Sequence, residues 1–301
     1  MSISRILSIA LALFLFSGTA QAQVNIFTCE PEWAALAGEI AGDRAKITSA
    51  TTALQDVHHI QARPSLIARA RRADLLFCTG AELEVGWLPM LLRKANNPRI
   101  QPGNIGHLMA TDHVELLDKR DQVDRSEGDI HAAGNPHIQT NPHKLIPVAL
   151  ELSKRLGQID PDNAQVYSDR FDAFEQKFSA AIQGWEARAE PLRGRKMVTH
   201  HRSWIYLQDW LGMEGVGTLE SKPGIPPSSR HLSQLLSEMG RSPADMIIYA
   251  SYQDDSASNW LSSRSGIPEV KLPISVGGTD AATDLFGFYD DLIDRMLSVI
   301  K

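Results

Sequence analysis

The residues that decide the expected architecture are 160–190, which read DPDNAQVYSDRFDAFEQKFSAAIQGWEARAE. Apolar side chains recur there at intervals of three and four residues, the spacing of one face of an α-helix. They are Tyr167, Phe171, Phe174, Phe178, Ile182 and Trp185. Roughly 30 helical residues span about 45 Å, which is long for a globular protein. Because this helix lies in the middle of the chain, we expect it to join two halves rigidly.

Both halves of the chain alternate short apolar runs with amphipathic stretches. The predicted strands are Val24–Cys29, Ile47–Ala50, Ala73–Cys78, Lys196–Thr199, Ala244–Ala250 and Val270–Pro273. The predicted helices are Pro31–Ala41, Pro64–Arg72, Glu82–Lys94, Pro142–Leu156, Ser203–Leu211, His231–Met239, Asp255–Arg264 and Ala281–Ile300. This alternation is typical of parallel sheets covered by helices. The sequence therefore predicts an α/β protein with an N-terminal lobe (23–159), a linking helix (160–190) and a C-terminal lobe (191–301).

The composition places the chain among ordinary globular proteins. Of its 301 residues, 43% are hydrophobic and 22% are charged, which argues against disorder. The length fits about two domains, at roughly 100–200 residues for each. The formal net charge of −6 shows no basic footprint, so we expect no nucleic-acid partner.

The first 22 residues have the layout of a cleavable signal peptide. Arg5 precedes the apolar run Ile6–Phe16, which is too short for a stable membrane span, and Ala20-Gln21-Ala22 is a small-x-small cleavage site. A membrane anchor is the alternative. Later segments do not approach about 20 continuous apolar residues, so we expect a soluble, monomeric protein in the periplasm.

The chain has two cysteines, Cys29 and Cys78, each at the end of a predicted strand. An exported protein meets oxidising conditions, so a disulfide can form if the two strands are neighbours. Cysteine is also a common buried apolar residue, so a pair of buried thiols is an equal alternative.

Ten histidines form the most informative feature, because most of them cluster at 58–59, 107–143 and 200–201. His58–His59 and His200–His201 follow predicted strands, and His137 ends a long polar stretch. The ends of parallel strands are where open α/β sheets bind ligands, and imidazole is a common zinc ligand. A metal held by all three places would bridge the two lobes. Only one member of each doublet is expected to face it.

The remaining histidines have weaker interpretations. His107, His113 and His231 are interpreted as surface residues. The irregular stretch 96–141 is long enough to be functional. Within and just after it, His113, His131 and His143 either form a weak metal-collecting loop or are incidental.

Three motifs in this order resemble the zinc and manganese receptors of bacterial ABC importers, the cluster A-I or TroA-like metal-binding family. The motifs are Asp56-Val57-His58 with Pro64, Asn135-Pro136-His137 with Asn141-Pro142, and Val198-Thr199-His200-His201 with Trp204 and Tyr206. The loop Pro223–Ser228 is also similar to the family's pattern. The resemblance covers nearly the whole mature chain.

The resemblance implies His58, His137 and His201 as metal ligands, in a cleft between two α/β lobes joined by one long helix. It also implies a permease with its ATPase as partners. The chain departs from the pattern because the stretch 272–278 lacks the carboxylate that usually supplies a fourth ligand. Asp280, His131 and water are the alternatives for that position.

Three imidazoles with at most one carboxylate favour zinc over manganese, which prefers oxygen donors, although copper and nickel also bind imidazole. We therefore expect a receptor that delivers zinc to an ABC importer. A zinc hydrolase is a rival, because three histidines and a water also form a catalytic site. The sequence has no His-Glu-x-x-His motif, and we do not expect an enzyme. A metallochaperone or a surface adhesin could use the same site.

Overall fold

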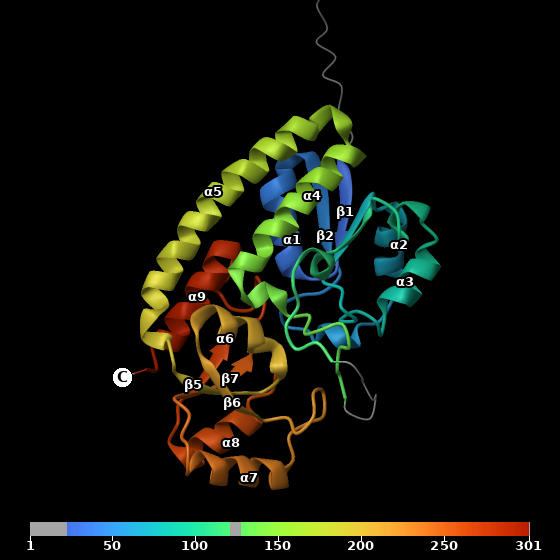
Figure 1. Ribbon diagram of the computed structural model, residues 1–301. Helices are drawn as coiled ribbons and strands as arrows, with labels where there is room; N and C mark the ends of the chain where they lie inside the picture. Colours follow the sequence, from blue (N-terminus) through green and yellow to red (C-terminus); the bar gives the residue numbers. More distant parts are fainter. Residues whose placement is uncertain (1–22, 121–127, 301) are drawn as a thin grey trace, which may run out of the picture.

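The computed structural model describes residues 23–120 and 128–300, so the predicted signal peptide lies outside the described residues. The chain folds into two parallel four-stranded sheets, one in each half (Figure 1). In spatial order, the first sheet contains β2 (Ala45–Ser49), β1 (Val24–Thr28), β3 (Leu75–Cys78) and β4 (His107–Met109). The second contains β6 (Glu214–Thr218), β5 (Lys196–Thr199), β7 (Met246–Ala250) and β8 (Glu269–Leu272). The prediction of two α/β lobes is confirmed.

The helices flank these sheets, and one of them runs along both lobes. The helices of the first half are α1 (Pro31–Ala41), α2 (Pro64–Arg72), α3 (Leu88–Ala95) and α4 (Leu145–Ile159). Those of the second half are α6 (Ile205–Leu211), α7 (Ser229–Met239), α8 (Ser256–Ser265) and α9 (Leu285–Leu297). Between them, α5 (Ala164–Ala189) has 26 residues and is extended at each end by a short 3-10 turn. Its predicted apolar stripe is buried.

Two strands were not predicted, and both lie at the edge of a sheet. β4 has only three residues, and β6 reads EGVGT with two glycines and no fully buried residue. The inner strands β3 and β7 are buried throughout, because helices cover a parallel sheet on both faces. An edge strand has fewer neighbours and needs no continuous apolar run, so β4 and β6 lack the pattern that reveals the others.

The predicted helix Glu82–Lys94 was too long at its start, because α3 begins at Leu88. The backbone N–H groups of Thr79 and Gly80 donate to the buried Glu84 carboxylate at 2.7 and 3.1 Å. The chain then turns through Ala81 and Glu82, whose φ values of 47° and 67° are left-handed. A tertiary contact of one carboxylate thus replaces the first turns of the expected helix.

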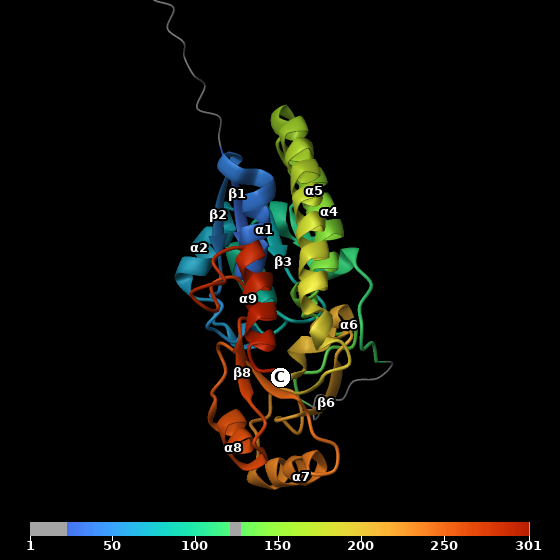
Figure 2. The same cartoon turned by 90° about the vertical axis from the view of Figure 1, so that its left-hand side faces the viewer.

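A continuous apolar core joins the two halves of the molecule. The last helix, α9, packs against both α5 and α1, as two views show (Figure 1 and Figure 2). Phe178 and Trp185 of α5 lie 5.8 and 4.9 Å, centroid to centroid, from the Tyr289 ring of α9. The largest core cluster contains residues of both lobes. The lobes are therefore joined through a packed aromatic interface and not through a few free residues.

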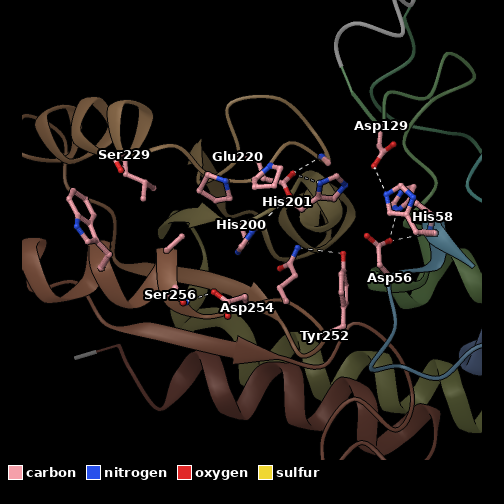
Figure 3. A pocket seen from close by; sticks show the side chains of 18 residues that line it. Asp56, His58, Asp129, His200, His201, Glu220, Ser229, Tyr252, Asp254 and Ser256 are labelled. Carbon is pink, nitrogen blue, oxygen red and sulfur yellow. Dashed lines mark hydrogen bonds and ion pairs between the residues drawn. The ribbon is translucent and has the colours of Figure 1, made fainter.

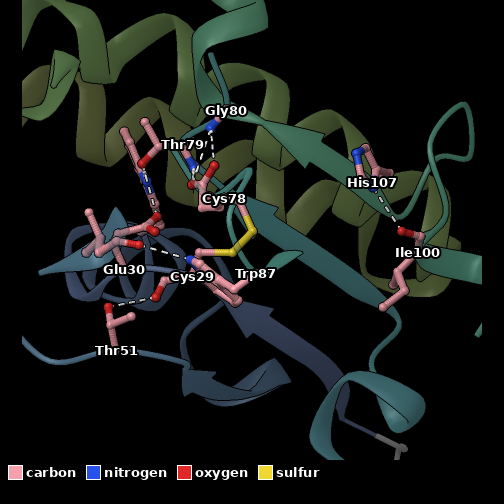
Figure 4. Close-up of a disulfide and its surroundings, with 12 residues drawn as sticks. Cys29, Glu30, Thr51, Cys78, Thr79, Gly80, Trp87, Ile100 and His107 are labelled. Atoms are coloured by element: carbon pink, nitrogen blue, oxygen red, sulfur yellow. Dashed lines mark hydrogen bonds between the residues drawn. A yellow bond between two sulfur atoms is a disulfide. The ribbon is translucent and has the colours of Figure 1, made fainter. Parts of the chain in front are cut away.

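The two cysteines form a disulfide between neighbouring strands (Figure 4). Cys29 directly follows β1 and Cys78 ends β3, and both are fully buried. The alternative of two buried thiols is therefore wrong. The bridge ties the two strands together at their carboxyl ends, beneath the loops that lead to the histidines. No helix within the described part of the chain is long and apolar enough to cross a membrane.

Candidate metal centre

His58 lies on a short 3-10 turn, Val57–His59, that follows β2. Asp56 caps this turn, because its Oδ1 accepts the backbone N–H of His58 at 3.0 Å. The same oxygen lies 2.8 Å from Nδ1 of the His58 ring. The Trp87 indole holds the turn from the other side by donating to the Val57 carbonyl at 2.9 Å. With Nδ1 engaged by a carboxylate, the ring is left with Nε2 as its free metal-binding atom.

His201 is held in the same way on the other lobe. It follows β5, and its Nδ1 lies 2.7 Å from Oε2 of Glu220, which follows β6. Glu220 is itself fixed, because its Oε2 also accepts the backbone N–H of Gly224 at 2.9 Å. His200, the other member of the doublet, lies 3.8 Å from the second oxygen of Glu220. Of the two neighbours, His201 is therefore the one whose Nε2 is directed by a close carboxylate.

His137 follows a segment that the second lobe holds in place. Tyr206 of α6 donates its hydroxyl to the Asn135 carbonyl at 2.7 Å, and the Asn135 amide donates to the Arg202 carbonyl at 2.8 Å. Gly134 precedes it with a φ of 126°, and a Cβ there would lie 2.7 Å from the Leu116 side chain. A glycine is therefore required for the chain to pass this point.

The three predicted ligands converge from three separate loops. Ring centroids of His58, His137 and His201 lie 5.7 to 5.9 Å apart in every pairing. One nitrogen from each ring lies within 4.8 Å of the other two. Among the described residues one other group of donors is as close, Cys29, Cys78 and Glu84, but those sulfurs are bonded to each other.

His131 also reaches this cluster. Its Nε2 lies 3.4 Å from Nε2 of His58. Two nitrogens bound to one tetrahedral zinc at about 2.0–2.1 Å are about 3.3–3.4 Å apart, so this spacing fits a shared ion. The loop of His131 is held by both lobes, because Asp129 N–H donates to the Pro223 carbonyl at 2.9 Å and Ala132 N–H donates to Glu82 at 3.2 Å.

Asp280, the other candidate for a fourth ligand, lies elsewhere. It is exposed on the loop after β8 and does not line the cavities at the histidines. His107 and His231 each hydrogen-bond to a backbone carbonyl, and His143 pairs with a glutamate of α5 at 2.7 Å. His143 thus faces α5, whereas His131 belongs to the cluster, so the structure does not support a collecting loop that contains both.

Burial lowers the pKa of two of the clustered imidazoles, those of His131 and His137. The pKa of His131 falls to about 4, chiefly by desolvation and then by the neighbouring rings of His58 and His201. The pKa of His137 lies well below its usual value for the same two reasons, since it is fully buried beside three other imidazoles. Neutral imidazoles have free lone pairs, and a cation is the ligand that such a set can bind.

A cavity of about 640 Å³ opens beside the cluster, between the two lobes (Figure 3). Asp56, His58 and His201 line it, as do Leu232 of α7 and Trp260 of α8. Asp56 and Glu220 were not predicted as functional residues. Asp56 stands two residues before His58 in the quoted motif, which is a usable sign, whereas Glu220 is brought to His201 only by the pairing of β5 with β6.

Comparison with known proteins identifies the family. The sequence profile of the family described as zinc-uptake complex component A, periplasmic (ZnuA), matches residues 26–301. This chain belongs to the ZnuA family. The resemblance predicted from the three histidine motifs is therefore confirmed.

Curated relatives of this ZnuA-family chain include binders of two metals. The zinc-binding lipoprotein AdcA of Streptococcus pneumoniae serotype 4 is 22% identical over 99% of this chain, and the match spans 60% of AdcA. The manganese ABC transporter substrate-binding lipoprotein PsaA of Streptococcus pneumoniae is 24% identical over 84% of this chain and 80% of PsaA. The chain thus spans about three fifths of the first of these relatives.

Solved structures show the same fold. A crystal structure of ZnuA superposes with a TM-score of 0.78 at 20% identity, covering 93% of this chain and all of that one. A manganese-bound periplasmic metal-binding protein of Candidatus Liberibacter asiaticus gives a TM-score of 0.75 at 16% identity, again over 93% of this chain and all of that one. The family contains solute-binding receptors, and its relatives bind zinc or manganese.

Proposed function

We propose that this chain is a periplasmic receptor that binds one zinc ion through His58, His131, His137 and His201 and delivers it to an ABC importer. The observation that carries the proposal is the convergence of His58, His137 and His201 from both lobes, with Nε2 of His131 3.4 Å from Nε2 of His58. Two of them, His58 and His201, have Nδ1 engaged by a carboxylate, which directs Nε2. The zinc ion is cargo and not a resident cofactor.

The proposed ligand set favours zinc among the metals of the family. Four nitrogen donors suit zinc, whereas manganese prefers oxygen. The nearest carboxylates, Asp56 and Glu220, already contact Nδ1 atoms and support the ligands from behind. We propose His131 for the position for which Asp280 and water are the alternatives, and the tetrahedral spacing between its Nε2 and that of His58 supports this choice.

The same set argues against a hydrolase, since a catalytic zinc keeps one position open for water. Four imidazoles fill all four positions, so we propose no enzymatic activity. A metallochaperone or an adhesin would have the same site, and the importer is favoured because the name of PsaA describes an ABC transporter substrate-binding protein. The proposal includes a cleaved signal peptide (1–22), a monomer, lobes at 23–159 and 191–301, and the rigid helix 160–190.

Metal analysis of the purified protein, followed by zinc competition with a chelator of known affinity, tests the proposal. His58→Ala, His137→Ala and His201→Ala should each lower zinc affinity by more than the roughly 10–100-fold that loss of a supporting carboxylate costs. His131→Ala should lower the zinc affinity as well. His107→Ala and His231→Ala are matched controls, since both rings bond only to backbone carbonyls among the described residues. Equal losses in all six variants would contradict the site.

A further inference from the structure

The cavity beside the histidines has an unusual lining. Four carboxylates face it, those of Asp56, Asp129, Glu220 and Asp254. No lysine or arginine is among the described residues that line it. Its volume of about 640 Å³ is far more than a metal ion needs and is in the range of organic ligands and side chains. A guest of this cavity is therefore expected to carry positive charge.

The cavity reaches the groups that support the metal ligands. Asp56 and Glu220, which hold Nδ1 of His58 and His201, both line it, whereas His131 and His137 do not. The Asp56 side chain is 38% exposed and that of Glu220 is 11% exposed. A guest in the cavity can thus contact the supporting carboxylates without first entering the space between the four rings.

One ring nitrogen of a buried side chain in the cavity wall has no hydrogen-bond partner among the described residues. His200 is only 7% exposed and lines the cavity, and its buried Nδ1 has no hydrogen bond. Leu232 of α7 and Trp260 of α8 add apolar surface to the lining. A cavity that has both apolar surface and carboxylates fits a long aliphatic side chain with a cationic head, such as lysine or arginine.

We propose that the cavity receives a lysine or arginine side chain from an outward-facing loop of the importer's permease, and that this cation draws Asp56 and Glu220 away from the ligand histidines. This inference rests on the proposed receptor function. Charge complementarity selects the occupant, since an anionic loop would meet four carboxylates and, among the described lining residues, no lysine or arginine. Docking would then lower the zinc affinity by removing the carboxylates that hold the ligand histidines. Zinc would be released where the permease can take it.

The size of the effect follows from the role of these carboxylates. Loss of a partner that holds a ligand imidazole lowers metal affinity by about 10–100-fold. A cation that engages both Asp56 and Glu220 should therefore raise the zinc dissociation rate by about 10-fold or more. Asp254 and Trp260 contact neither His58 nor His201 in this structure, so they can be changed without altering the metal site itself.

The test uses the zinc-loaded protein and follows zinc transfer to a fluorescent chelator in excess. The probes are a blocked tripeptide, acetyl-Leu-Arg-Arg-amide, and its counterpart acetyl-Leu-Glu-Glu-amide at equal ionic strength. We expect the arginine peptide to accelerate release and the glutamate peptide to have no effect. The Asp254→Asn and Trp260→Ala variants should bind zinc normally and lose most of the acceleration.

The outcomes separate the two proposals. If the protein does not bind zinc at all, the receptor function itself is overturned. If zinc binds but the two peptides act alike, or if the two variants respond as the unmodified protein does, the docking proposal is overturned while the receptor function stands. If spermidine accelerates zinc release as strongly as the arginine peptide does, the guest of the cavity would be a free amine. That result would overturn the proposal of a permease loop.

Discussion

Two buried polar clusters in this protein have opposite chemistry. Three glutamates are buried together: Glu30 directly precedes α1, Glu32 lies in its first turn, and Glu84 lies in the turn after β3. Burial raises the pKa of Glu32 and of Glu84 to about 7, whereas it lowers the pKa of His131 to about 4. Desolvation thus disfavours charge in both clusters, but the acids keep their protons and the imidazoles lose theirs.

Donors of the protein contact each of these carboxyl groups, although the buried Oε1 of Glu30 has no partner among the described residues. The Thr79 hydroxyl donates to Glu30 at 3.0 Å, as Figure 4 shows, and backbone N–H groups donate to Glu84. Ser275 of the second lobe donates to Glu32 at 2.5 Å. The imidazoles have no such donors, because His58 and His131 turn their Nε2 atoms toward each other. Burial therefore does not by itself make a metal site; lone pairs must be left without a protein donor.

The strongest test of this contrast is to remove Glu84, which accepts hydrogen bonds from two buried N–H groups of its own turn. Glu84→Ala should lower the free energy of unfolding by roughly 2–5 kcal/mol, because two buried N–H groups lose their acceptor. Glu82→Ala is the matched control two residues away, with one exposed contact to Ala132, and should change little. Urea unfolding of the metal-free protein measures both. Similar losses in the two variants would show that Glu84 does not close the turn.

The pH dependence of stability should differ in sign between the clusters. Glu32 has a raised pKa of about 7, so its stabilising contribution is present below about pH 4.5 and is lost as the pH rises through about 7. His131 has a lowered pKa of about 4, so its contribution is present above about pH 6.5 and is lost as the pH falls through about 4.

The variant Glu32→Gln isolates the acidic half of this contrast, since its amide oxygen can still accept from Ser275. Relative to the unmodified protein, it should gain roughly 2–3 kcal/mol of unfolding free energy between pH 4.5 and pH 8. Urea unfolding of metal-free protein at the two pH values is the measurement. An unchanged pH profile would mean that Glu32 is ionised throughout.

Substitution of the supporting carboxylates, Asp56 and Glu220, should have a smaller effect than the substitutions above, and it should change the metal affinity alone. Asp56→Asn and Glu220→Gln should each lower the zinc affinity by about 10–100-fold, because an amide holds the imidazole less strongly and can favour the wrong tautomer. Asp254→Asn, a carboxylate of the same cavity without a ligand imidazole, is the control. Chelator competition measures all three, and a loss in the control equal to the others would remove the special role of Asp56 and Glu220.

The smallest expected change is in the shape of the molecule. Because α5 and α9 share an aromatic core, zinc should order the ligand loops without a large closure of the lobes. Hydrogen exchange with and without zinc should show added protection in the described residues 128–141 and around His201. The Gly277-Gly278 turn should change little, since Asp280 lies outside the cluster. A marked compaction in X-ray scattering would show that α5 is not a rigid link.

The sequence by itself determined the elements and the three principal histidines. Apolar runs and threes-and-fours spacing are local patterns, so they predicted the inner strands and α5. The motif order gave His58, His137 and His201 because each histidine is defined by its near neighbours in the chain. The edge strands β4 and β6 were not predicted, because their exposed positions do not require an apolar pattern.

Only the tertiary structure decided which distant residues meet. The sequence left Asp280, His131 and water open for the fourth position, and of the two side chains the His131 loop, held by both lobes, is the one that reaches the His58 ring. Glu220 meets His201 because β6 pairs beside β5, and the cysteines are bonded because β1 neighbours β3. Distances between residues far apart in the chain depend on sheet order and loop closure, and no local pattern records either.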